Sequence, residues 1–167
     1  NTRLPYGSEL PRMPLSKGRS AAPLALETGR PQVGDIIDGP VARQTLVAIA
    51  VPVLREGLPT RLMTTTLETR RFQERMDSTA LPEGWSLALL DGTGAAIARH
   101  SPPGFDSARD VDPGHRFVVK SDLAAWSVVL EIPRSADGAS RRDAISILVA
   151  ATFLATGLGV AGGMLAS

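Results

Sequence analysis

The sequence contains no cysteine and only two histidines. Without cysteine the chain has no disulfide framework, no thiolate nucleophile and no thiolate metal site. The lack of cysteine does not indicate whether the protein resides in an oxidising or a reducing compartment. Net charge is also nearly absent, because 18 Lys and Arg residues face 17 Asp and Glu residues and leave a formal charge of +1. A chain without a net positive charge lacks the basic surface that binds a phosphate backbone, so no nucleic-acid partner is expected.

The length and the apolar content support a folded protein. The chain has 167 residues, and 43% of them are hydrophobic, which suffices for one domain or two small ones. It begins at Asn1, with neither a Met nor a leader-like apolar segment. We therefore expect these residues to be part of a longer protein.

The longest apolar run lies at the C-terminal end. Residues 144–167 include 24 positions without a charge, and as a helix they would extend about 36 Å against about 30 Å of bilayer hydrocarbon. The alternative, a buried core helix, would need a large globule to hide every side of it. The run predicts a transmembrane helix, preceded by a juxtamembrane linker at 135–143, and makes the lipid bilayer an expected partner.

The first 40 residues are rich in Pro and Gly and are expected to be mostly loop. One short helix is expected within them, over AAPLALET, with Ser20 as its cap and Gly29 as its end. In the same stretch, Asp35 and Asp38 of GDIIDGP are typical of turn chemistry.

A hairpin and a helix follow. The runs VARQTLVAIAVPVL (41–54) and RLMTTTL (61–67) are rich in β-branched and aliphatic residues and predict two antiparallel strands. Thr65 and Glu68 have the spacing of a capping box, which predicts a helix of about three turns before Leu81 and Pro82.

The segment after Gly84 predicts four short strands. Residues 85–90 and 95–100 flank Asp91-Gly92-Thr93-Gly94, which is typical of a hairpin turn. A dinucleotide fingerprint is disfavoured there, because Ile97 stands where its third Gly belongs. After a loop over 101–114, RFVVKSD and WSVVLEIP supply two more strands. Hairpin following hairpin favours an antiparallel sheet.

Catalytic and metal signals are weak. Five oxygen and nitrogen ligands lie within sixteen residues, but no spacing among them matches an EF-hand or a zinc helix, so neither a metal nor a cofactor is expected. These ligands are His100, Asp106, Asp110, Asp112 and His115. The sequence also lacks a GxSxG elbow, and no catalytic residue is expected in this fragment.

Several phrases together resemble the extracytoplasmic sensor region of bacterial sensor histidine kinases, and more narrowly the double Cache type, in which two PAS-like modules lie between two transmembrane helices. The phrases are NTRLPYG (1–7), ETGRPQVGDIIDGPV (27–41), AVPVLREG (50–57), LPEGWSLALLDGTGAAIAR (81–99) and WSVVLEIPR (126–134).

The resemblance implies an α+β fold of PAS-like antiparallel sheets with a linking helix, followed by the transmembrane helix. Residues 1–80 would be the second half of a membrane-distal module together with the linking helix, and residues 81–134 a small membrane-proximal module. Residues 1–143 would then lie outside the cytoplasm, at the bacterial inner membrane. Arg141 and Arg142 alone would place that side inside by the positive-inside rule, and we give the resemblance more weight.

The resemblance also directs attention to the last strands of the distal module. In double Cache proteins that recognise amino acids, these strands commonly supply a carboxylate for the ligand ammonium, whereas residues 63–66 here are Met-Thr-Thr-Thr. The candidate ligand-binding residues are therefore Arg43, Gln44, Thr64 and Thr66, which suit an anion or a neutral polar molecule. The alternative is that Arg43 faces solvent and the threonines are ordinary strand formers.

Two functions are consistent with these observations. The first is the ligand-sensing fragment of a membrane receptor, a histidine kinase in its full length, that passes a conformational change to the transmembrane helix. The second is a single-span anchored, β-rich domain that mediates protein contacts without sensing a ligand. A small polar extracellular ligand and a homodimer are expected for the first.

Small residues on the predicted span generate a first testable prediction. They recur at every fourth position, with Gly159 and Gly163 forming a GxxxG pair, which predicts a helix dimer contact. The stripe comprises Ala151, Ala155, Gly159 and Gly163. In a membrane two-hybrid assay of residues 141–167, Gly159→Leu and Gly163→Leu should abolish self-association, and Leu154→Ile should not. Equal signals from all three variants would place the interface elsewhere.

Overall fold

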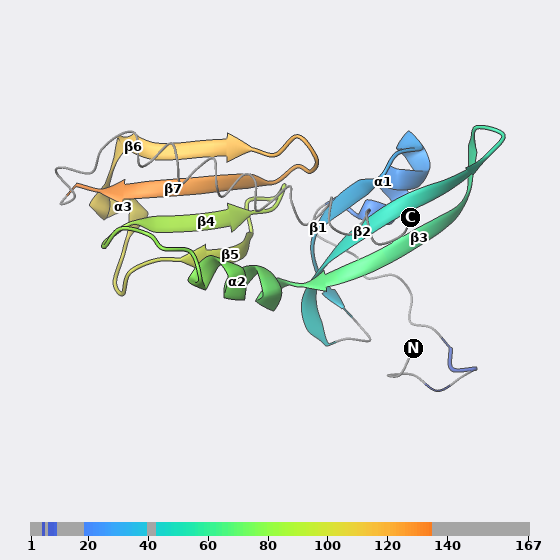
Figure 1. The fold of residues 1–167 in the computed structure, drawn as a ribbon, viewed down its shortest axis with the longest axis horizontal. Helices are drawn as coiled ribbons and strands as arrows, with labels where there is room; N and C mark the ends of the chain where they lie inside the picture. Colours follow the sequence, from blue (N-terminus) through green and yellow to red (C-terminus); the bar gives the residue numbers. More distant parts are fainter. Residues whose placement is uncertain (1–4, 6, 10–18, 40–42, 135–167) are drawn as a thin grey trace. The chain divides into compact units, whose positions relative to one another are not determined.

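The computed structural model describes residues 5, 7–9, 19–39 and 43–134. The predicted linker, transmembrane helix and small-residue stripe, at 135–167, lie outside these residues. None of the helices within the described ranges combines the length and the apolar character needed to cross a membrane. The chain divides into two compact units, residues 1–71 (unit 1) and 72–167 (unit 2), and the division falls inside helix α2, Thr69–Asp77 (Figure 1).

Unit 1 is a three-stranded antiparallel meander with one helix against it. The strands are β1 (Gln32–Gly39), β2 (Gln44–Arg55) and β3 (Leu58–Glu68), in the order β1-β2-β3. Helix α1 (Ala21–Thr28) contacts all three strands (Figure 1). Ala21 and Ala25 of α1 pack with Ala50 of β2, and all three are buried. The small side chains let the helix lie close to the sheet.

The predicted helix is confirmed at its bounds, but the loop expected after it is wrong over residues 32–39, which form β1. Gly29 ends α1 in the left-handed conformation, with φ of 64°, whereas the Ser20 side chain makes no capping hydrogen bond. Residues 34–39, GDIIDG, lie in β1 and not in turns. A register shift between Val33 and Ile36 accommodates Gly34 and Asp35, so the turn-forming residues sit in a bulge of the strand.

The β2–β3 hairpin extends further than its sequence pattern predicts. A turn at Glu56 and Gly57, both with positive φ, joins the strands, and the pairing continues to Leu46 opposite Glu68. The capping-box prediction is therefore wrong, because Thr65 and Glu68 both lie inside β3. Three consecutive threonines favour the extended backbone there, and α2 begins only at Thr69.

Unit 2 contains a four-stranded antiparallel sheet in the order β5-β4-β7-β6. The strands are β4 (Ser86–Leu90), β5 (Ala96–His100), β6 (Val111–Lys120) and β7 (Ser127–Pro133). The first and last of them, β4 and β7, pair at the centre. The predicted loop at 101–114 is partly wrong, since it holds the short helix α3 (Ser107–Asp110) and the start of β6. Asp106 caps α3 through a hydrogen bond from the Ala108 N–H.

The predicted hairpin turn at 91–94 is confirmed by its hydrogen bonds. The buried Asp91 carboxylate accepts from the backbone N–H groups of Thr93 and Ala95, each at 2.9 Å. It also accepts from the Thr93 hydroxyl at 2.6 Å. One carboxylate thus replaces the backbone partners that a tight turn lacks.

The outer edges of the two sheets carry features that hinder pairing with another strand. The β1 edge has its bulge and a backbone bond from Asp35 N–H to the Arg19 carbonyl, and β6 has a register shift over 111–116 with Pro113 inside it. The β5 edge is covered by Gln73 of α2, whose side-chain amide bonds both backbone groups of Arg99. The outer edge of β3 has Pro59 and a register shift next to the hairpin turn, whereas its residues 62–67 are uncharged and paired without interruption.

The two tryptophans generate the prediction for this fold. Trp85 is 1% and Trp126 6% exposed, and the Trp126 ring packs edge-on against Phe72 with centroids 5.7 Å apart. Truncating either ring to Ala should lower the free energy of unfolding by about 3 to 5 kcal/mol. Leu123, which is 56% exposed, is the control, and Leu123→Ala should cost less than about 0.5 kcal/mol. Chemical denaturation measures all three, and a tryptophan variant as stable as the control would contradict the prediction.

Candidate functional site

One face of the unit 1 sheet brings three of the four predicted ligand residues together. Thr64 and Thr66 lie opposite Ala50 and Ala48 in the β2–β3 register. Gln44 lies an even number of residues from both alanines, and alternation along a strand therefore places it on the same face. Helix α1 packs on this face through Ala50, and both threonines are exposed on the edge strand beside it.

Arg43 does not belong to this row. It precedes β2 in a turn with a φ of 51°, and its N–H donates to the Gly39 carbonyl at 2.7 Å. A left-handed turn residue is not a member of the strand, so alternation assigns its side chain to neither face. The prediction that Arg43 stands at the head of the strand is therefore correct only in sequence order.

The structure adds Glu68, a carboxylate that the sequence reasoning missed. It lies opposite Leu46 on the same face as Thr64 and Thr66. With the Gln44 amide nitrogen turned toward it, Gln44 donates to the two carboxylate oxygens at 3.0 and 3.1 Å. Arg70 Nη2 lies 3.5 Å from Glu68 Oε2. The sequence does contain a signal for Glu68, because Thr64, Thr66 and Glu68 are spaced by two residues, as on one face of a strand. The assignment of Thr65 and Glu68 to the start of a helix obscured this spacing.

The resulting row of side chains defines the candidate site, comprising Gln44, Thr64, Thr66 and Glu68. Its groups include an amide, two hydroxyls and a carboxylate, so the row can both donate and accept hydrogen bonds. It contains no thiol and no histidine that would activate a hydroxyl as a nucleophile. The row can form hydrogen bonds with a polar molecule.

The position of α1 over this face depends on a close backbone contact. The Asp35 carboxylate, 3% exposed, accepts from the Arg19 N–H at 2.6 Å. The neighbouring Gly34 has no room for a side chain, because a Cβ there would lie 2.8 Å from the Ala21 nitrogen. A hydrogen bond therefore holds the start of α1 to the β1 bulge, and Gly34 permits this close approach because it has no Cβ.

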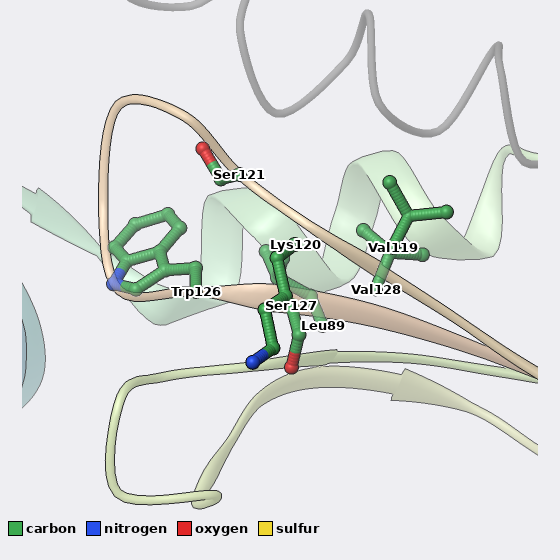
Figure 2. A pocket seen from close by; sticks show the side chains of 7 residues that line it. All are labelled: Leu89, Val119, Lys120, Ser121, Trp126, Ser127 and Val128. Atoms are coloured by element: carbon green, nitrogen blue, oxygen red, sulfur yellow. The ribbon is translucent and has the colours of Figure 1, made fainter.

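Unit 2 contains a small hollow. A hollow at the β6–β7 turn is lined by residues of β4, β6, β7 and the turn (Figure 2). The lining residues are Leu89, Val119, Lys120, Ser121, Trp126, Ser127 and Val128. Its volume of about 10 Å³ is room for about one water molecule. The hollow is too small for a metabolite of amino-acid size.

The five potential metal ligands are used in separate local contacts. His100 Nδ1 lies 3.8 Å from Asp77, and His115 Nδ1 lies 3.9 Å from Asp112. The hydrogen bond from Arg109 lowers the pKa of Asp110 to about 2, which keeps this carboxylate charged in a cation pair. In the described part of the chain, no three His, Cys, Asp or Glu residues are placed to hold a metal ion.

Solved structures show a related fold. The ligand-binding domain of the Pseudomonas aeruginosa amino acid chemoreceptor PctB, in complex with L-Arg, matches with a TM-score of 0.53 and 16% identity over 81% of this chain and 68% of that domain. The extracellular domain of mmHK1S-Z2, assigned as a histidine kinase, matches with a TM-score of 0.53 and 13% identity over 69% of this chain and 55% of that one.

A third match is the ligand-binding domain of the Campylobacter jejuni chemoreceptor Tlp3, in complex with 4-methylisoleucine. Its TM-score is 0.50, its identity 12%, and it covers 74% of this chain and 55% of that one. The chain thus spans little more than half the length of two of these three domains. No protein-family model and no curated protein matches the sequence.

These likenesses establish the fold. The chain has the α+β arrangement of antiparallel sheets with few helices that extracellular, Cache-type domains of histidine kinases and chemoreceptors share, as the sequence resemblance implied. The matched structures are an extracellular domain and two ligand-binding domains.

The contact between Gly34 and α1 is testable. Gly34→Ala should push the start of α1 away from β1 and destabilise the protein by about 1 to 3 kcal/mol, as overpacking typically does. Gly114→Ala is the matched control, because a Cβ there meets nothing within 4 Å, and its effect should stay within about 1 kcal/mol and can be stabilising. Urea unfolding of both variants measures these effects. Equal unfolding midpoints would contradict close packing of α1 against Gly34.

Proposed function

We propose that the chain is the extracytoplasmic ligand-sensing part of a bacterial membrane receptor, with residues 1–143 outside the cytoplasm. The observation that carries this proposal is the polar row on the unit 1 sheet, found in a fold whose solved examples include ligand-binding domains of chemoreceptors. Residues 1–80 and 81–134 would act as a membrane-distal and a membrane-proximal module. A histidine kinase as the full-length protein agrees with one of the matched domains.

The candidate row indicates the kind of ligand. Gln44 donates hydrogen bonds to the Glu68 carboxylate, and Arg70 lies close enough to offset its charge. Thr64 and Thr66 are exposed, and they lie on β3, an edge strand of the described sheet. Such a surface suits a small polar molecule with both donors and acceptors more than a strongly charged one. Two matched domains hold an amino acid or a close analogue, so amino acids are the first compounds to test.

The proposed mechanism requires no covalent chemistry. A ligand that binds one conformation of the sensor better than another shifts the population toward the first by its difference in affinity. In the proposed receptor, this change in conformation reaches the transmembrane helix at 144–167. There it alters the contact with a second copy of the receptor. Under the alternative, a contact domain without ligand, Thr64 and Thr66 would be ordinary strand formers on an exposed strand.

Thermal unfolding of the full chain in detergent, against a panel of amino acids and other small polar metabolites, tests the proposal. A true ligand at about 100 times its dissociation constant should add roughly 2.7 kcal/mol to the stability of a single-site protein. The double variant Thr64→Val, Thr66→Val should lose this stabilisation and keep its fold, because Val retains the branched shape that strands favour.

The control for this experiment is Thr93→Val, which removes a hydroxyl far along the chain in the 91–94 turn. It should lower basal stability but leave the ligand-induced shift unchanged. A panel without any stabilising compound would contradict ligand sensing and favour the contact domain. Turnover of any compound by the purified chain would contradict both.

A further inference from the structure

The C-terminal end of strand β7 in unit 2 carries a buried carboxylate. Glu131 lies between the buried Leu130 and Ile132, and its side chain is 9% exposed. A charged group in such a place is costly unless hydrogen bonds or opposite charges compensate for the lost water. The partners of Glu131 therefore indicate which part of unit 2 is attached to this strand.

Two side chains from one stretch of sequence contact the Glu131 carboxylate. The Ser107 hydroxyl, at the start of α3, donates a hydrogen bond to Glu131 Oε1, and α3 lies at the arrowhead of β7 (Figure 1). Arg116 of β6 lies opposite Glu131 in the sheet register, with its Nε 3.4 Å from the same oxygen. Because the Arg116 side chain is about half exposed, water screens its charge. The half-buried Ser107 is thus the residue that attaches α3 to the strand.

The same stretch pairs with the end of β7 across a wide bulge. Val111 lies opposite Pro133, and the next pair in the register joins Arg116 and Glu131. Four residues, 112–115, therefore face a single residue of β7, and the β6 chain bulges out between the two pairs. A bulge interrupts the ladder of backbone hydrogen bonds, so backbone pairing alone would hold this end of β7 weakly.

Arg134, directly after β7, has two bonds to this stretch. Its N–H donates to the carbonyl of Asp110, the last residue of α3, at 2.9 Å. Its Nε lies 2.8 Å from Asp112 Oδ1, in an ion pair whose side chains are both about half exposed. Contacts at the buried carboxylate, in the backbone pairing and after the strand therefore all come from residues 107–116.

We propose that residues 107–116 form a clamp that keeps the end of β7 from opening, and that Ser107 is the residue that positions this clamp. If the Ser107 hydroxyl releases Glu131, α3 loses this attachment to the sheet, and the Asp110 carbonyl then leaves the Arg134 N–H. The two bonds are at opposite ends of a four-residue helix, about 6 Å apart along its axis. Loss of one bond therefore acts directly on the other.

The clamp has a consequence because strand ends open more easily than strand centres. The chain continues from Arg134 into residues 135–143, the predicted juxtamembrane linker. In the proposed receptor the clamp would hold the residue from which this linker starts, and this use of the clamp rests on the proposed function. The clamp itself concerns unit 2 alone and needs no ligand. Its test can therefore fail while ligand sensing holds, and the reverse.

Backbone amide exchange of the full chain in detergent, followed residue by residue by NMR, tests the clamp. Ser107→Ala removes the hydroxyl and introduces a residue that favours a helix. It should raise the exchange rate of the Arg134 amide about tenfold, the effect of losing one hydrogen bond to a charged group. Ser107→Thr keeps the hydroxyl, and its Arg134 amide should exchange as in the unchanged protein.

The matched control is Ser101→Ala, in the loop before α3. The Ser101 and Ser86 hydroxyls share a hydrogen bond with an oxygen–oxygen distance of 2.6 Å, and Ser86 is buried. This bond attaches the loop to β4 and not to the end of β7. Its loss should lower the overall stability but leave the exchange rate of the Arg134 amide within about twofold of the unchanged protein.

A second variant tests the outer part of the clamp. Asp112→Asn removes the ion pair with Arg134 and keeps the size of the side chain. Because both side chains are about half exposed, exchange of the Arg134 amide should rise only about two- to threefold. A rise as large as that of Ser107→Ala would assign the main attachment to Asp112 and overturn the role of Ser107.

Three further results would overturn the inference. If Ser107→Ala leaves exchange of the Arg134 amide unchanged, the end of β7 is held without α3. If Ser101→Ala raises this exchange as strongly as Ser107→Ala, the effect is a general loosening of the loop. If Ser107→Thr exchanges as fast as Ser107→Ala, the hydroxyl of Ser107 is not the attachment.

Discussion

The direct passage from strand β3 into helix α2 is the constraint on which the rest of the molecule depends. A loop at this point would let the sheet of unit 1 and the helix move separately, whereas consecutive residues at Glu68 and Thr69 fix the end of one to the start of the other. Glu68 belongs to the polar row, and Thr69 is bonded to β2. The end of the candidate row and the start of α2 thus occupy neighbouring positions of the chain.

The two sheets use their last strand differently. In unit 2 the last strand, β7, has a neighbour on each side, and its residues 128–132 are buried. In unit 1 the last strand, β3, has one neighbour and is mostly exposed. Burial of both faces gives unit 2 its core of tryptophan and aliphatic side chains, whereas β3 of unit 1 exposes Thr64 and Thr66 together with Leu58 and Met63. The proposed recognition by unit 1 depends on this exposure of β3.

The sequence predicted the strands well where apolar and β-branched residues alternate, and α1 where Gly29 ends it. It failed at GDIIDGP, because a bulge can place turn-forming residues in the middle of a strand, and the bond that stabilises it comes from Arg19, sixteen residues away. It failed again at Thr65, because capping spacing is local, whereas the pairing of β3 with β2 is not. The row at Gln44, Thr64 and Thr66 was predicted in part, and Glu68 emerged only from the register.

The uncharged outer edge of β3 has a consequence for handling the protein. Residues 62–67 read Leu-Met-Thr-Thr-Thr-Leu, a segment of high β-propensity without Pro, Gly or charge, which is the composition that feeds cross-β growth. Its charged neighbours, Arg61 and Glu68, stand at the two ends of the segment and not within it. Because edge-to-edge pairing of two such strands is bimolecular, a purified sample should aggregate faster as its protein concentration is raised.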